Sequence, residues 1–253
     1  MTVAMEDRVV GYRGRIGVVV PSTNTVVEHD LSLINPRGVT FHSGRFFVEQ
    51  PDLSSDDMFL DFLGKIRDTI PDSVRDLMTA DPDYILMGMS AETFWGGKEG
   101  NQEFEDRINE ISGGLPITSG ANACNDALAR LGVERIACLT PYQPIGDEQV
   151  HGYFTECGFD VKRVKGLKCE TATSIGDTTP EEVIAALKEL DGDDIDAIVQ
   201  CGTNLSMVSI ADEASKWLGK PVLAINAVCL WHALRSMGID DQFHGHGIML
   251  REF

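Results

Sequence analysis

Four short segments rich in small polar residues could carry out chemistry, because each follows an apolar run that is typical of a buried strand. The segments are 21–24 (PSTN), 88–97 (GMSAETFWGG), 140–144 (TPYQP) and 201–204 (CGTN). Helices are predicted to start soon after the first and the last of them, and the N–H groups at a helix start can hold a carboxylate without a lysine. The same donors can stabilise an enediolate. This anion forms when the carbon next to a carboxylate keeps the electron pair of a broken bond and shares it with the carboxylate oxygens. The pattern therefore predicts chemistry beside a carboxylate.

Cys201 is the candidate catalytic residue. It ends the apolar run AIVQC (197–201) and is followed at once by Gly202, Thr203 and Asn204. A thiol beside backbone N–H groups can exchange a proton with a substrate, whereas a cysteine that only fills space is the competing interpretation. The position at a strand end favours the working thiol. The remaining cysteines are expected to pack in strands or helices, apart from one in a loop that could cover the site: Cys124, Cys138, Cys157, Cys229 and, in the loop, Cys169.

Polar residues of the same segments are candidates for binding a carboxylate. Tyr142 could donate its hydroxyl group or simply anchor its loop, and Asn24 could present its amide or cap the following helix. Ser90 and Thr203 occupy matching places in the two halves of the chain, which favours a pair of hydrogen-bond donors. The backbone N–H of Gly202 would complete the set.

Three further residues have a weaker case. Trp95 stands between Phe94 and two glycines, which suggests an aromatic wall on a flexible loop. His42 and Arg45 lie in a predicted strand, where they could supply positive charge or face solvent.

The elements that position these residues alternate along the chain between strand and helix. One helix, TPEEVIAALKEL from Thr179, opens with an N-terminal capping signature. Alternation of this kind predicts an α/β fold with parallel sheets, in which ligands bind outside the carboxyl ends of the strands. The strands are too apolar to be half-exposed, and they are predicted at 15–20, 39–47, 84–88, 116–120, 135–140, 160–164, 197–201 and 221–225.

The chain repeats itself, and the repeat divides it into two lobes. Arg15-Ile16 matches Arg135-Ile136, the segment 81–90 matches 194–203, and 115–124 matches 220–229, all in the same order. We therefore predict two pseudo-symmetric Rossmann-like lobes, each a four-stranded parallel sheet with flanking helices, and an active site in the cleft between them. Residues 1–13 form a tail, 14–125 with 236–253 form the first lobe, and 126–235 form the second. The repeat sets Gly88 opposite Cys201.

Composition excludes several classes of function. The formal net charge is −19, which would repel nucleic acid and anionic membrane surfaces, so the expected partner is a small carboxylate, and self-association stays open. The chain lacks a secretory signal and CxxC spacing, which favours a cytoplasmic protein with reduced cysteines. No GxGxxG motif follows the first strand, and neither a Walker loop nor a GxSxG elbow is present, so no cofactor is expected. No metal is expected either, since the one close histidine pair, His244 and His246, is more typical of a loop.

These features together resemble the Asp/Glu racemase superfamily. The resemblance rests on the two-lobed repeat, PSTN after the first strand, TPY after the fifth, and a thiol at the end of a strand in the second half, and it covers roughly residues 14–250. The most similar branch contains maleate cis–trans isomerases and arylmalonate decarboxylases. Members of this superfamily work without a metal or pyridoxal cofactor, and its racemases and maleate isomerases use one cysteine from each lobe.

The resemblance implies roles for particular residues. Cys201 matches the cysteine of the second lobe, whereas the position in the first lobe is Gly88, as in the decarboxylases. In that branch the substrate loses carbon dioxide, a pocket holds the enediolate, and the single cysteine protonates it. Carried over, the pocket consists of the Ser90 and Tyr142 hydroxyls with backbone amides of Ser90, Cys201 and Gly202, above a floor shaped by Pro21. Met89 replaces the threonine that the decarboxylases have before the serine.

The resemblance therefore favours decarboxylation of a malonate-like or arylmalonate-like acid through an enediolate that Cys201 protonates. Asn24 and the Thr203-Asn204 pair look instead like the isomerase branch. A maleate isomerase or a racemase with a replaced first cysteine is the alternative. A protein that binds carboxylates without transforming them is the second alternative.

Overall fold

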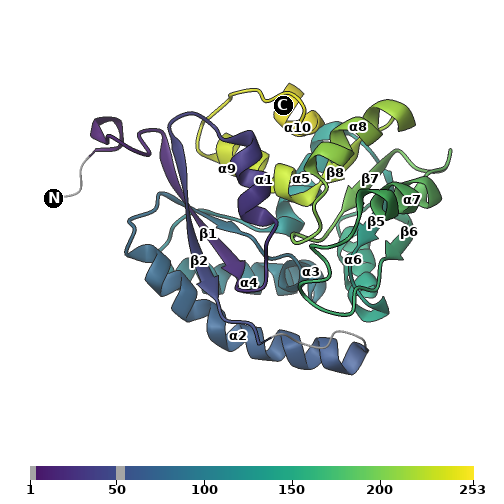
Figure 1. Cartoon of the computed structure of the whole chain (residues 1–253), viewed down its shortest axis with the longest axis horizontal. Coiled ribbons are helices and arrows are strands. Elements are labelled where there is room, and N and C mark those ends of the chain that lie inside the picture. The colour runs from purple at the N-terminus through teal and green to yellow at the C-terminus, as the bar shows by residue number, and fades with distance from the viewer. Residues whose placement is uncertain (1–3, 50–54) are drawn as a thin grey trace.

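Two four-stranded parallel sheets organise the computed structural model, which describes residues 4–49 and 55–253 (Figure 1). The first sheet has the order β2-β1-β3-β4 and the second the order β6-β5-β7-β8, so both halves of the chain build the same arrangement. The strands are β1 (Gly14–Pro21), β2 (Val39–Phe46), β3 (Tyr84–Met87), β4 (Ile117–Thr118), β5 (Arg135–Thr140), β6 (Asp160–Gly166), β7 (Ala197–Gln200) and β8 (Val222–Ala224). The predicted fold class and all eight predicted strands are confirmed.

Helices connect the strands and lie against both faces of the sheets (Figure 1). The helix predicted from Thr179 begins as expected, because the Thr179 side chain accepts from the Glu182 N–H while the Glu182 carboxylate accepts from the Thr179 N–H. The helices are η1 (Met5–Asp7), α1 (Val27–Ile34), α2 (Asp56–Met78), α3 (Ala91–Phe94), α4 (Gly97–Ile111), α5 (Gly120–Leu131), α6 (Pro144–Glu156), α7 (Pro180–Leu190), α8 (Val208–Leu218), α9 (Ile225–Ser236) and α10 (Ile248–Glu252).

Two of the edge strands, β2 and β6, are less buried than the central strands β3 and β7. All four residues of β3 and of β7 are buried, because helices cover both faces of the sheets there. In contrast, β2 and β6 lie at the edges and keep partly exposed side chains. The prediction that every strand is fully buried is therefore wrong for these two.

An aspartate–arginine contact recurs at the same place in both sheets. In the first, the Asp83 carboxylate accepts from the backbone N–H of Arg15 at 2.9 Å. In the second, the Asp196 carboxylate accepts from the backbone N–H of Arg135 at 2.8 Å. Each contact joins the start of the third strand of a lobe to the start of the first strand. The repeat read from the sequence thus has a counterpart in hydrogen bonds.

The last part of the chain ties the two halves together. Helix α9 follows the second sheet but packs against α1 and α5, and α10 packs on α9. The Arg13 guanidinium forms two hydrogen bonds with the Asp241 carboxylate, at 2.6 and 2.8 Å, which fastens the C-terminal segment to the start of β1. The lobe boundaries at 125 and 235 stay a prediction.

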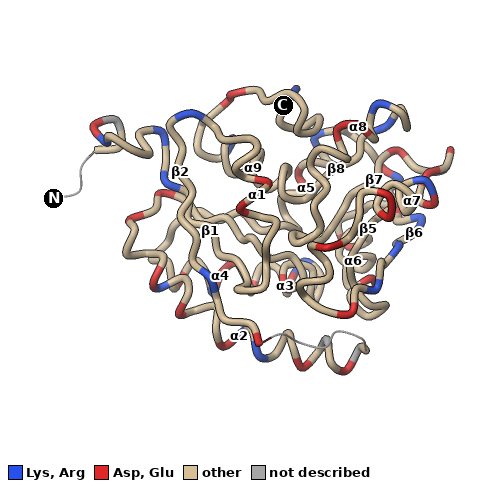
Figure 2. The backbone as a smooth tube through the Cα atoms, in the orientation of Figure 1, with Lys and Arg blue, Asp and Glu red and all other residues tan. Residues whose placement is uncertain are grey.

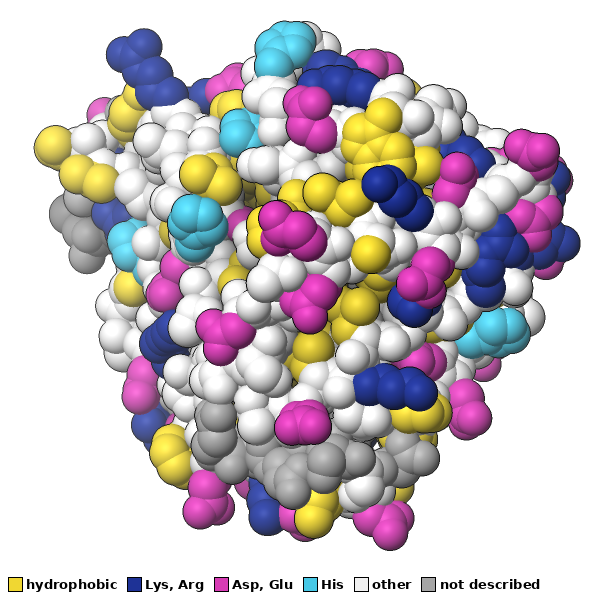
Figure 3. Space-filling model, turned by 45° about the vertical axis from the view of Figure 1, so that its right-hand side comes forward, with side chains coloured by type: hydrophobic (Ala, Val, Ile, Leu, Met, Phe, Trp, Pro, Cys, Tyr) yellow, Lys and Arg dark blue, Asp and Glu magenta, His cyan; other side chains and the backbone are white. Residues whose placement is uncertain are grey.

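The surface carries charges of both signs. Acidic residues are spread over the helices and loops of both halves (Figure 2), and acidic and basic side chains alternate over the face in Figure 3. Among the residues that the structure describes, no helix is long and apolar enough to cross a membrane.

Candidate active site

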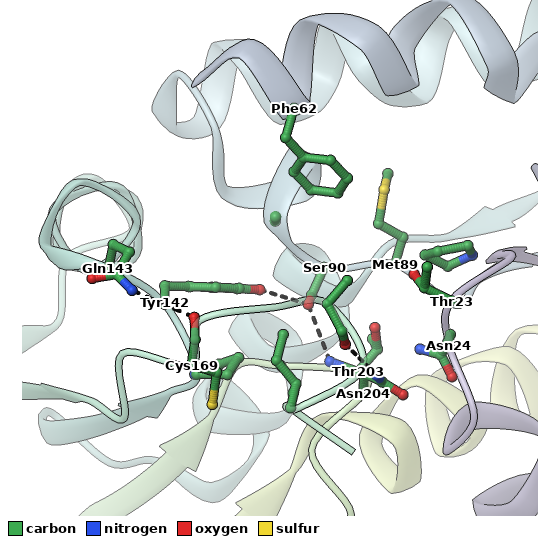
Figure 4. Close-up of a pocket in the computed structure, with 16 residues that line it drawn as sticks. Thr23, Asn24, Phe62, Met89, Ser90, Tyr142, Gln143, Cys169, Thr203 and Asn204 are labelled. Carbon is green, nitrogen blue, oxygen red and sulfur yellow. Dashed lines mark hydrogen bonds between the residues drawn. The ribbon is translucent and has the colours of Figure 1, made fainter. Parts of the chain in front are cut away.

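A cavity of about 70 Å³ lies where the carboxyl ends of the two sheets face each other (Figure 4). All four segments singled out in the sequence contribute to its wall, and α2 and the loop between β6 and α7 add the rest. The lining residues are Pro21, Thr23, Asn24, Phe62, Met89, Ser90, Ala91, Pro141, Tyr142, Gln143, Cys169, Ala172, Ile175, Gly202, Thr203 and Asn204. None of these lining residues is acidic, basic or histidine, so a bound anion would be held by neutral donors.

Ser90, Tyr142 and Thr203 form a hydrogen-bonded cluster on the cavity wall (Figure 4). The hydroxyl groups of Ser90 and Tyr142 are 2.7 Å apart, and the backbone N–H of Thr203 donates to Ser90 Oγ at 3.1 Å. The Thr203 hydroxyl donates to the carbonyl of Gly88 at 3.1 Å. Burial raises the pKa of Tyr142 far above its ordinary value, so its hydroxyl stays neutral and remains a donor. Three of the residues predicted as carboxylate binders therefore lie together.

Asn24 caps the following helix, which is one of the two roles that its position suggested. Its Oδ1 accepts from the N–H groups of Val26 and Val27 at 3.0 and 2.9 Å, which caps α1. Its Nδ2 is buried, has no hydrogen-bond partner within the described ranges, and lies on the cavity side of the residue in Figure 4. A buried donor without a partner costs about 1–3 kcal/mol. A carboxylate oxygen in the cavity would remove that cost.

Asn204 and Gly202 shape the wall. Asn204 Oδ1 accepts from the Thr25 N–H at 2.9 Å, and its Nδ2 donates to the Ala172 carbonyl at 2.8 Å, so this side chain joins the two lobes. A Cβ at Gly202 would lie 2.5 Å from the Pro141 ring, so only glycine fits there. Pro21 is the last residue of β1 and lines the cavity as expected.

The Cys201 sulfur lies behind the cavity wall. The side chain is fully buried, its Sγ is 3.9 Å from the Val199 carbonyl, and it faces Cys138. Because side chains alternate along a strand, Cys201 falls on the same side as Val199, toward the interior of the second lobe. Burial, and then the neighbouring Cys138, raise the pKa of the thiol well above its ordinary value. The structure thus shows a neutral thiol one layer below the cavity, and not on its wall as the sequence suggested.

Gly88 also lies behind the wall. A Cβ added there would be 2.3 Å from Val20 Cγ1 and 3.2 Å from Val27 Cγ1, inside the packed first lobe. A cysteine at this position would have to displace a stiff, β-branched neighbour. The packing around Gly88 therefore leaves no room for a cysteine side chain at this position.

Gly88→Ala is expected to lower the free energy of unfolding by about 1–3 kcal/mol, because the added methyl overpacks this contact. Val20→Ala should recover part of the loss in the double variant by making room. Urea unfolding of the four proteins measures both effects. Equal stability of Gly88→Ala and wild type would contradict the packing described here.

Four of the other cysteines lie as predicted, three in the packed core and one in the loop over the cavity. Cys124, Cys138 and Cys229 are buried in the core, whereas Cys169 lines the cavity from the loop before α7. The Cys169 sulfur is 3.8 Å from the Thr178 hydroxyl. That loop therefore covers the site, as the sequence suggested.

The cavity wall does not include Trp95, His42 or Arg45, the three candidates with the weaker case. Trp95 packs against the core beside α3, and the wall includes no part of it. The His42 ring is 2.9 Å from the Thr40 hydroxyl. Arg45 donates twice to the Asn24 carbonyl, at 3.1 and 2.7 Å, so it supports the PSTN segment from outside.

Some lining residues were missed in the sequence. Phe62 comes from the middle of α2, where an apolar residue reads as ordinary helix packing, and Figure 4 shows its ring across the cavity from Ser90. Ala172 and Ile175 lie in the loop before α7, where no motif marks them. Only the folded loop brings them to the site.

Comparison with known proteins identifies the family. The family model described as arylmalonate decarboxylase matches residues 16–250. A maleate isomerase of Nocardia farcinica is 27% identical over 247 residues, covering 94% of this chain and 96% of that protein. One of Geobacillus stearothermophilus is 25% identical, covering 93% of this chain and 96% of that protein.

Solved structures agree with this assignment. The Nocardia farcinica maleate cis–trans isomerase bound to TRIS superposes with a TM-score of 0.85 at 28% identity, covering 94% of this chain and 98% of that one. An arylmalonate decarboxylase has a TM-score of 0.75 at 21% identity, covering 93% and 98%, which shows a shared fold. The resemblance seen in the sequence is confirmed. The chain belongs to the arylmalonate decarboxylase family, in the branch of the Asp/Glu racemase superfamily that also holds the maleate isomerases.

Proposed function

We propose that this protein is a cofactor-independent enzyme that acts at the carbon next to a carboxylate of a small carboxylic acid, through an enediolate. The observation that carries the proposal is Asn24 Nδ2, which has no hydrogen-bond partner in the described part of the chain and lines an uncharged cavity beside the Ser90–Tyr142–Thr203 cluster. Neutral donors already in place suit an anion that gains charge during the reaction. Each such donor contributes about 3–4 kcal/mol when judged from oxyanion-hole deletions.

The names of the relatives favour cis–trans isomerisation of a small unsaturated acid such as maleate. A variant of the Nocardia farcinica isomerase was solved with a covalently bound succinylcysteine. In such a reaction with a single thiol, the S–H group of Cys201 would add across the carbon–carbon double bond. The sulfur would bond to one carbon, which gives the enediolate, and the proton would then go to the other carbon. Rotation about the resulting single bond and the reverse elimination would release the trans acid and restore the thiol.

Decarboxylation is the second candidate, and two structural observations favour it. The packing at Gly88 leaves no room for a second thiol, and the raised pKa of Cys201 keeps its thiol neutral, as a proton donor requires. The bond to the departing carboxylate would break, carbon dioxide would leave, and the electron pair would remain as the enediolate. Cys201 would give its proton to that carbon and regain one from water.

Both reactions need the Cys201 sulfur to reach the substrate. Its neighbours Gly202 and Thr203 already line the cavity, so the backbone lies at the wall. We propose that rotation about the Cα–Cβ bond brings the sulfur from its contact with Cys138 into the cavity when an acid is bound. The role of Cys201 in catalysis therefore depends on a rotamer change.

A screen in D₂O by proton NMR tests the function. Maleate, alkyl- and aryl-substituted malonates and chiral 2-substituted acids are offered to the wild type and to Cys201→Ser. Fumarate formed from maleate supports isomerisation, carbon dioxide with one deuterium in the product supports decarboxylation, and exchange alone supports racemisation. Acids that raise Tm equally in both proteins without turnover would indicate a binding protein and contradict catalysis.

A further inference from the structure

Asp30 is a buried carboxyl group that the chemistry above does not use. It lies in α1 with 1% of its surface exposed. Its Oδ2 accepts from Asn226 Nδ2 at 2.7 Å, whereas its Oδ1 has no hydrogen-bond partner within the described ranges. Burial raises the pKa of Asp30 to about 6. An incompletely partnered buried carboxyl lowers stability, so its presence calls for an explanation.

The Asp30 contact leads to the cavity through one amide group. Asn226 Nδ2 donates both to Asp30 and to the carbonyl of Thr203, at 2.9 Å. Thr203 in turn donates from its N–H to Ser90 and from its hydroxyl to Gly88. Helix α1 belongs to the first half of the chain, whereas Thr203 and Asn226 belong to the second. The chain of contacts therefore fixes the 201–204 turn against the opposite lobe.

A carboxylate is suited to this task because it accepts hydrogen bonds only. Beside it, Asn226 must present its NH₂ group, and the same NH₂ group then meets the Thr203 carbonyl. An apolar residue at position 30 would remove one of the two acceptors of this NH₂ group and leave the Thr203 carbonyl to orient the Asn226 amide alone. The ionised form of Asp30 therefore holds the Asn226 amide, and through it Thr203, more firmly than a neutral residue would.

We propose that Asp30 is a positioning residue of the active site, which acts through Asn226 to hold Thr203, and with it the Ser90 hydroxyl, in place for the enediolate. This inference rests on the proposed function. Asp30 touches no substrate in this account. The ionisable groups around it are His29 on the same helix and, at the start of that helix, the pair Glu28 and Arg45.

Two substitutions separate the parts of this role. Asp30→Leu removes the acceptor, and kcat/KM should fall by about tenfold or more, the effect of losing one hydrogen bond to a charged group. Asp30→Asn keeps the size and restores an acceptor in one of its two orientations, so it should retain more activity than Asp30→Leu. The acid limb of the kcat/KM profile near pH 6 should flatten in Asp30→Asn. Asp147, whose pKa is also raised to about 6, remains in that variant, so the change is assigned to Asp30.

Two readouts do not require turnover. The folded pKa of Asp30 lies above its ordinary value, so ionisation destabilises the fold between about pH 4 and 6, and Asn at position 30 escapes that loss. The Tm of Asp30→Asn minus that of the wild type should therefore increase by about 2 °C or more as the pH rises from 4 to 7.5. Amide hydrogen exchange of residues 201–204 should be faster in Asp30→Leu.

Asp212→Asn is the matched control. Asp212 is also buried, but Lys216 and Arg251 pair with it and it does not line the cavity. The control should lower Tm and leave kcat/KM within about twofold. Wild-type kcat/KM in both Asp30 variants would overturn the proposal, as would unchanged exchange at 201–204. If the wild type turns over no acid, the proposed function fails, while the exchange and Tm results still decide whether Asp30 holds the turn.

Discussion

Replacing Cys201 by serine is expected to lower kcat by roughly 10²–10⁴-fold, the usual contribution of a positioned proton donor. A serine hydroxyl has nearly the same shape, so the fold should survive, but it is a much weaker acid than a thiol and a poorer nucleophile. The loss should be the same in kind for isomerisation and for decarboxylation, because each passes the Cys201 proton to carbon. Steady-state kinetics with any acid found in the screen measures it.

Two other cysteines serve as matched controls. Cys138 faces Cys201 in the core, and Cys169 lines the cavity from the opposite loop. Cys138→Ala and Cys169→Ser should keep kcat within about threefold of the wild type, since neither group is assigned a proton transfer. Loss of activity in Cys169→Ser with full activity in Cys201→Ser would move the chemistry to the covering loop and refute the assignment to Cys201.

Tyr142→Phe is expected to lower kcat by about 10²-fold with a smaller change in KM, as oxyanion donors do. The variant loses the hydroxyl that lies 2.7 Å from Ser90 and keeps the ring that packs in the wall. Ser90→Ala should have a similar effect. The double variant should be much less impaired than the product of the two losses, because both act on the same anion.

Tyr153→Phe is the control for this pair. Tyr153 is also buried and donates to Asn122 Oδ1 at 3.0 Å, but it lies outside the cavity wall. It should cost about 1 kcal/mol of stability and leave kcat unchanged. Equal kinetic losses in Tyr142→Phe and Tyr153→Phe would mean that the effect of Tyr142 is one of stability alone.

The fold could be predicted from the sequence because its signals are periodic and repeated. Buried parallel strands leave apolar runs such as 84–87 and 197–200, and the two halves carry them in the same order. The aspartates that precede these strands recur because each one holds the start of its neighbouring strand. Exposure at β2 and β6 could not be read in the same way, because it depends on the order of strands in the sheet.

The segments that form the site could also be predicted, but the direction of single side chains could not. Strand ends locate Ser90, Tyr142, Thr203 and Asn24, and all four meet at the cavity. The Cys201 sulfur and the space around Gly88 depend on which face of the strand each residue occupies, and the structure turns both toward the interior of their lobes. Phe62 and Ile175 reach the cavity only through long-range packing, which leaves no local mark.

Both proposed reactions depend on one step, in which an enediolate in the cavity takes its proton from Cys201. Its most direct test is the deuterium content, by proton NMR in D₂O, of the product made by the wild type and by Cys201→Ser. We predict that a decarboxylated or racemised product made by the wild type carries solvent deuterium at the carbon next to the retained carboxylate, and that Cys201→Ser loses both product and label. A decarboxylated product without solvent deuterium, or any product or label that appears at the same rate in Cys201→Ser, would contradict it.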